Sequence, residues 1–78
     1  MDKFYPLYNK ICLLKNGEEV LVDIGSHLIM LSVKKVGASY HVSKLYKDEE
    51  SFTWERSLTV YVYENIDYAF ELVKAWVM

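Results

Sequence analysis

The sequence predicts an α+β fold, in which an antiparallel sheet of four or five strands built from hairpins carries one C-terminal α-helix packed across one face. Three observations support this. Segments of alternating polarity fill the middle of the chain, tight-turn dipeptides separate them, and residues 65–78 have a helical pattern. The 78 residues are enough for a single domain. Within it we expect an N-terminal arm (1–6), the sheet (10–63) and the helix (65–78).

The first hairpin is expected at residues 10–24. Asn16-Gly17 is the dipeptide that a two-residue type I′ turn prefers, since both central residues need a positive φ. Such a turn places Lys15 opposite Glu18, and it lines up alternate aliphatic residues on one face of the strand pair.

The same segment also fits a helix. A helix from Pro6 to Lys15, capped by Gly17, would place Leu7, Ile11 and Leu14 on one side. Of the two interpretations, the hairpin is the favoured prediction.

A second hairpin is expected within residues 27–47, where two alternating segments flank a turn at Gly37. It puts Tyr40 and Val42 on the same face as Val33. Its register is open, because the loop can close on either side of the glycine.

The clearest strand follows a polar break at residues 47–51. From Phe52 to Val62 every second residue is mostly apolar, and Leu58–Tyr63 is rich in the residue types that strands favour. We expect Leu58, Val60 and Val62 to face the helix. Thr59, Tyr61 and Tyr63 would then face away from it.

Asn65 is the predicted N-cap of the final helix, with Asp67 in the first turn, where the helix dipole favours a carboxylate. The apolar arc of this helix is wider than one sheet face can cover. The set expected on the sheet is Ala69, Leu72, Val73 and Trp76.

Ile66, Phe70 and Val77 remain on one flank of that helix as a patch that needs a cover. Two covers are open. Either the aromatic arm folds back over the patch, or the patch is a homodimer seam or a groove for a partner. The arm residues that would do this are Phe4, Tyr5 and Leu7.

Composition excludes several classes. Apolar residues make up 53% of the chain, which argues against disorder, and no apolar run approaches the roughly 20 residues of a membrane span. The N-terminal segment lacks a signal-peptide pattern, so a cytoplasmic location is expected.

Catalytic and metal-binding motifs are not recognisable. Cys12 is the single cysteine, so an internal disulfide and a thiolate metal cluster are excluded, and it is expected to be a small buried hydrophobe. His27 and His41 have no diagnostic spacing to a nucleophile. The glycines are all accounted for by turns. We therefore predict no enzymatic activity, no catalytic residue, no metal site and no cofactor.

Charge is unevenly distributed along the chain. Residues 1–47 carry seven lysines and four acids, a net +3, whereas residues 48–78 carry two basic residues and seven acids, a net −5. Such an asymmetry concerns partners rather than fold. The predicted partner-binding residues are Asp48, Glu49, Glu50 and Glu55 as electrostatic contacts, with Tyr61 and Tyr63 as aromatic anchors.

These features favour a small non-enzymatic protein-binding module that occludes or bridges a partner surface. The expected form is an inhibitor encoded by a virus or mobile element that acts on a host nucleic-acid-binding or defence complex. The alternative is a sheet-face module for single-stranded nucleic acid, in which paired tyrosines stack on bases beside basic residues. That alternative would use Tyr61, Tyr63, Lys34 and Lys44.

Overall fold

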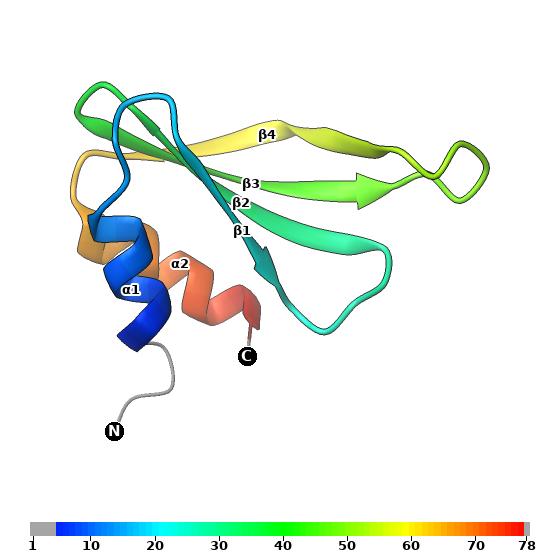
Figure 1. Cartoon of the computed structure of the whole chain (residues 1–78), viewed down its shortest axis with the longest axis horizontal. Helices are drawn as coiled ribbons and strands as arrows, with labels where there is room; N and C mark the ends of the chain where they lie inside the picture. The colour runs from blue at the N-terminus through cyan, green and yellow to red at the C-terminus, as the bar shows by residue number, and fades with distance from the viewer. Residues whose placement is uncertain (1–4, 78) are drawn as a thin grey trace.

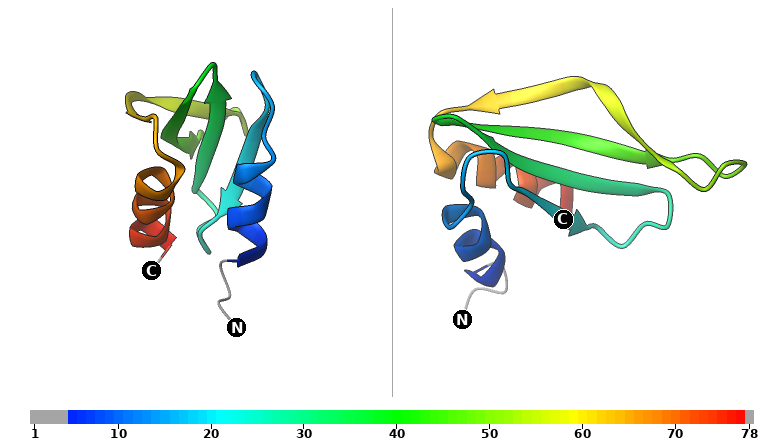
Figure 2. Two further views of the ribbon diagram at one scale, coloured as in Figure 1. Left: turned by 90° about the vertical axis from the view of Figure 1, so that its left-hand side faces the viewer. Right: turned by 45° about the horizontal axis from the view of Figure 1, so that its top comes forward.

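The computed structural model describes residues 5–77 and contains two helices and one four-stranded antiparallel sheet. The elements in chain order are α1 (Tyr5–Cys12), β1 (Glu19–Asp23), β2 (Ile29–Val36), β3 (Ser39–Lys47), β4 (Trp54–Tyr63) and α2 (Ile66–Val77). The strands lie in the order in which they occur, β1-β2-β3-β4, and both helices lie on the same side of the sheet (Figures 1 and 2). The predicted α+β fold, with its C-terminal helix packed on an antiparallel sheet, is confirmed.

The predicted first hairpin is wrong, because residues 5–12 form α1 and the sheet begins at Glu19 rather than at residue 10. Asn16-Gly17 does make a turn, but its partner is the far end of β2. The Gly17 amide donates to the Lys35 carbonyl (2.7 Å), and the Asn16 side chain accepts from the Gly37 amide (2.8 Å). These contacts hold the turn against the β2–β3 hairpin. The turn therefore does not pair residues 5–12 with β1, and those residues form the helix that the spacing of their apolar side chains favours.

The β2–β3 hairpin closes on Gly37-Ala38, with Val36 opposite Ser39 and Val33 opposite Val42. Gly37 has a φ of 60°, which suits a residue without a side chain. The predicted sharing of one face by Val33, Tyr40 and Val42 is confirmed by this register.

The core lies between that face and the two helices. Its fully buried members come from the central strands (Leu31, Val33 and Val42), from α1 (Ile11) and from α2 (Ala69 and Val73). The predicted N-cap is also confirmed, since the Asn65 side chain accepts a hydrogen bond from the Asp67 amide at 2.8 Å.

The two helices are joined at Tyr8. Its hydroxyl donates to the Asp67 carboxylate at 2.9 Å, and this hydrogen bond is the main reason that the pKa of Tyr8 rises to about 12. Its ring meets the Phe70 ring edge-on, with the centroids 5.1 Å apart. One side chain of α1 therefore both hydrogen-bonds to α2 and packs against it.

The face assignment of β4 is opposite to the prediction. Tyr61 lies across from Val42 and packs edge-on against Trp76 of α2, with the ring centroids 5.5 Å apart. Leu58 is fully exposed, and Val62 is 54% exposed on the other face. Successive side chains of a strand point to opposite faces. Assigning the wrong alternate set to the helix side therefore moves every side chain to the other face.

Replacing Ile11 and Leu13 separately by alanine tests α1. In a hairpin the two residues would share one face and would respond alike. In the helix Ile11 is fully buried, whereas Leu13 is largely exposed. We expect Ile11→Ala to lower the free energy of unfolding by about 2–5 kcal/mol and Leu13→Ala by less than about 0.5 kcal/mol, measured by urea denaturation. Equal losses would contradict α1.

Candidate protein-binding surface

The loop between β3 and β4 projects beyond both helices at the far end of the sheet (Figure 1). We call residues 48–53 the β3–β4 tip. Asp48 organises it: its amide donates to the Thr53 carbonyl, its carbonyl accepts from the Phe52 amide, and its carboxylate accepts from the Glu50 amide at 2.9 Å. The hydrogen bond from Glu50 is the main cause that lowers the pKa of Asp48. The tip is therefore a hydrogen-bonded loop.

Phe52 is the most unusual residue of the tip. It has a φ of 59°, a left-handed conformation that costs a bulky side chain about 1–3 kcal/mol, and its side chain is 73% exposed. The Lys47 ammonium lies 5.6 Å from its ring centroid. A strained, exposed aromatic at the end of a loop is a feature that core packing does not explain.

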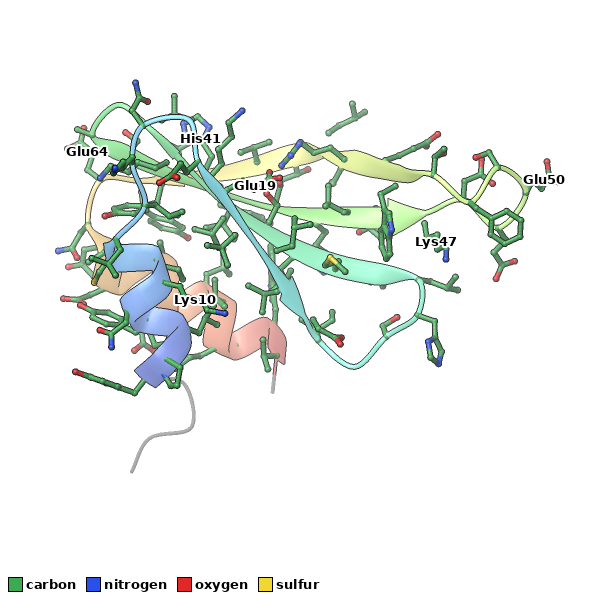
Figure 3. All side chains as sticks on the ribbon, viewed as in Figure 1. Lys10, Glu19, His41, Lys47, Glu50 and Glu64 are labelled. Carbon is green, nitrogen blue, oxygen red and sulfur yellow. The ribbon has the colours of Figure 1, made fainter. Side chains whose placement is uncertain are left out.

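The structure divides the predicted partner-binding residues between two places. Asp48, Glu49 and Glu50 lie in the β3–β4 tip, and Glu55 follows at the start of β4. Figure 3 shows Glu50 and Glu64 at opposite ends of the molecule. The other two predicted residues, Tyr61 and Tyr63, lie about 20–26 Å from Glu55 along β4.

Tyr61 and Tyr63 are therefore not neighbours of the acidic residues. Tyr63 packs against the helix-covered core, and Tyr61 lies beneath α2 against Trp76. The aromatic residues beside the acids are Phe52 and Trp54, which the sequence predicts only as part of a strand or a turn. The available signal was their position just after three consecutive acids, with only Ser51 between Glu50 and Phe52.

The face of the sheet opposite the helices, here called the open face, has a polar network at its centre. Ser32 and Ser43 are cross-strand partners on β2 and β3, and both are fully buried. The Arg56 guanidinium donates to both serine hydroxyls (3.2 and 2.6 Å) and to Glu19 on β1 (2.7 Å). Ser32 also donates to Glu19. Four strands are thus tied together on the face that neither α1 nor α2 covers.

This network sets the ionisation of Glu19. Partial burial raises its pKa, but hydrogen bonds from Ser32 and Arg56 and the positive charges of Arg56 and Lys34 outweigh burial and hold the pKa below its usual value. Glu19 consequently stabilises the folded protein in its charged form.

Exposed apolar side chains surround the network. On the open face Leu21 is 53% exposed, and Trp54 and Val60 are each somewhat more than a third exposed. Together with Leu58 and Val62 they form an apolar margin around a charged centre, which is a composition found at protein-binding surfaces.

The helix-covered side has a small hollow of about 170 Å³ between β4 and α2. Its lining residues are Lys44, Tyr46, Ser57, Thr59, Tyr61 and Trp76. The Lys44 ammonium lies 4.7 Å from the centroid of the Trp76 ring. This volume is below the roughly 300–1,000 Å³ of pockets that hold drug-sized ligands.

The basic residues of the nucleic-acid alternative do not share a face. Lys44 lies on the helix side, over Trp76, whereas Lys34 is the cross-strand partner of Glu19 and His41 on the open face. Tyr61 is also packed against α2 rather than presented on an open platform. The four residues of that alternative are therefore split between the two faces.

The apolar flank of α2 is covered from within the chain. Phe70 is only 7% exposed and contacts Tyr8 of α1, and Ile66 and Val77 are partly buried against the core. Of the predicted arm residues, Leu7 packs against the core and Tyr5 is exposed, while Phe4 lies outside the described residues.

Cys12 is exposed, not buried as expected, because it falls at the end of α1. Within residues 5–77, no group of three or more histidine, cysteine or acidic side chains is placed to hold a metal ion. In the same residues neither helix has the length and apolar character needed to cross a bilayer.

No family model, curated protein or solved structure matches this chain.

Glu19→Gln tests the network on the open face. We expect the free energy of unfolding at pH 7 to fall by about 1 kcal/mol, a value that allows for solvent screening of the part-exposed pair. Because the folded protein lowers the pKa of Glu19, this contribution is present above the ordinary value of 4.5 and is lost as Glu19 is protonated at lower pH. Urea denaturation at several pH values measures it. A deficit that is the same at about pH 3 as at pH 7 would contradict the assignment.

Proposed function

We propose that this protein is a non-enzymatic protein-binding module that contacts a basic partner surface with its β3–β4 tip. The observation that carries the proposal is Phe52, which is exposed at the end of the molecule in a strained conformation and held there by a hydrogen-bonded loop. Backbone strain of this kind persists where the surrounding structure enforces it, and it is concentrated at binding and catalytic sites.

Charge defines the partner. Asp48, Glu49 and Glu50 precede Phe52, and Glu55 follows it, so the aromatic ring is flanked by carboxylates on both sides. Carboxylates around the rim of a contact speed association with a positively charged surface, while a central aromatic supplies most of the binding energy. The chemistry favours a partner with an apolar recess surrounded by lysine or arginine.

Basic surfaces with apolar recesses occur on proteins that bind nucleic acids, where they neutralise phosphates. Occupation of such a surface by the β3–β4 tip would occlude it. The specific form of the proposal is therefore a cytoplasmic inhibitor, encoded by a virus or mobile element, that acts on a host nucleic-acid-binding or defence complex. The net charge of −5 on residues 48–78 supports this choice of partner class.

Phe52→Asn separates binding from stability. Asparagine tolerates the left-handed conformation better than phenylalanine, so we expect the free energy of unfolding to stay equal or to rise by up to about 1 kcal/mol. Recovery of the partner from a cell extract, quantified by mass spectrometry, should fall about tenfold or more. Leu13→Asn, which removes an equally exposed apolar side chain elsewhere, is the matched control. A variant that recovers every partner as the wild type does would contradict the proposal.

Glu50→Lys tests the charge of the tip, and it leaves the loop-forming carboxylate of Asp48 intact. We expect weaker recovery of the same partner at low salt and a smaller effect at high salt, because salt screens exposed charges. Glu71→Lys, an exposed acid on α2, is the control. Equal losses from the two substitutions would show that net charge, not the tip, governs binding.

A further inference from the structure

A β-bulge interrupts the pairing of β3 with β4. The regular register breaks between Ser43 and Leu45, so that residues 57–59 of β4 lie opposite the single residue Lys44 of β3. The middle residue of the bulge is fully exposed, while the residues on either side of it line the hollow between β4 and α2. Bulges redirect side chains and are frequent beside functional sites. This bulge therefore brings a serine and a threonine side chain to the hollow, next to a lysine.

The hollow is lined by hydrogen-bond donors. Four of its six lining residues carry a hydroxyl group, namely Tyr46, Ser57, Thr59 and Tyr61, and the other two are Lys44 and Trp76. The Ser57 oxygen accepts a hydrogen bond from the Thr59 amide at 3.2 Å, so its own hydroxyl proton is still available for a ligand. An ammonium surrounded by hydroxyl groups is a donor set that suits an oxyanion.

Lys44 is a half-buried cation without a carboxylate partner. Its ammonium lies 4.7 Å from the centroid of the Trp76 ring, whose π face attracts it. Within residues 5–77 it forms no ion pair, since the two that occur there are Arg56–Glu19 and Lys74–Glu71. Cations that are withdrawn from water are usually paired. A negatively charged ligand in the hollow would supply the missing charge.

We propose that this hollow binds a phosphate group, either as inorganic phosphate or as the phosphate of a monoester. The Lys44 ammonium is its counter-charge, and the hydroxyls of Ser57 and Thr59 donate to its oxygens. A phosphate can accept from all three groups at once, because it has more acceptor oxygens than the two of a carboxylate. This goes beyond the proposed function, which needs only the β3–β4 tip.

The size of the hollow fits this ligand. Its volume of about 170 Å³ is close to that of a cavity that holds one benzene molecule, about 150 Å³, so a tetrahedral oxyanion can enter. Tyr46 and Tyr61 in the lining are 43% and 42% exposed, so the hollow is open to solvent. The organic group of a monoester therefore has room to point outward.

Two negative groups nearby limit the affinity. Glu55 lies on the same face of β4 as Ser57 and is the cross-strand partner of Tyr46, although it does not line the hollow. The carboxyl end of α2, at Val77, also carries a partial negative charge beside Trp76. We therefore expect a dissociation constant of about 1–10 mM, and a value about twofold to threefold lower in Glu55→Gln.

NMR titration of the ¹⁵N-labelled full chain with sodium phosphate, at pH 7 and constant ionic strength, tests the proposal. We expect saturable shifts of the amides of residues 57–59 and of the Trp76 indole N–H. Lys44→Met removes the ammonium and keeps an apolar stem, so it should raise the dissociation constant about tenfold or more. Thr59→Val should raise it about threefold. Lys34→Met, which removes the same charge from the open face, should leave it unchanged.

A second titration with phenyl phosphate distinguishes the two sources of the phosphate group. A dissociation constant about tenfold lower than that of inorganic phosphate would identify a phosphorylated molecule as the ligand, and an equal or higher one would identify the free ion. In both cases binding should depend on Lys44. The absence of saturable shifts up to about 50 mM of either ligand would overturn the proposal. So would shifts that Lys44→Met and Thr59→Val leave unchanged, in variants whose spectra show the native fold.

The phosphate site and the proposed function can fail separately. Lys44→Met keeps an unaltered β3–β4 tip and should recover the protein partner as the wild type does. Phe52→Asn keeps an unaltered hollow and should bind phosphate as the wild type does. Each pair of measurements therefore shows which of the two proposals is wrong.

Discussion

The packing of two short helices against one face of the sheet is the constraint on which the rest of the structure depends. Val33 and Val42 lie opposite each other at the centre of that face and are fully buried beneath α1 and α2. Two short helices cannot cover a second face or reach the far end of β4. The open face and the β3–β4 tip are consequently left without a covering helix among the described residues.

The open face keeps its buried polar atoms satisfied without a covering layer. Ser32 and Ser43 would be costly if they were buried without partners, and Arg56 supplies donors to both while Glu19 balances its charge. The central strands β2 and β3 are therefore held by the apolar core on the helix side and by this polar network on the open face. The most deeply buried residues of the sheet lie on β2 and β3, and the strained Phe52 lies outside them in the β3–β4 tip.

Much of the architecture could be predicted from local patterns. The N-cap at Asn65, the hairpin at Gly37 and the strand at Leu58–Tyr63 depend on residues close together in the chain, and the structure confirms them. The prediction of the first hairpin was wrong because Asn16-Gly17 indicates a turn but does not determine which segment pairs with the turn. The acids of the candidate site were foreseeable from composition, but Phe52 was not, because a positive φ at a phenylalanine is imposed by the loop.

The sequence by itself determined the fold class, the helix at the C-terminus and the acidic character of residues 48–55, since periodicity, capping and charge are local properties. Only the tertiary structure decided which face of β4 meets the helix. Alternation defines two faces but does not say which is buried, and the choice followed from pairing Tyr61 with Val42. The tertiary structure likewise separated Tyr61 and Tyr63 from the acids, because this outcome depends on contacts between distant segments.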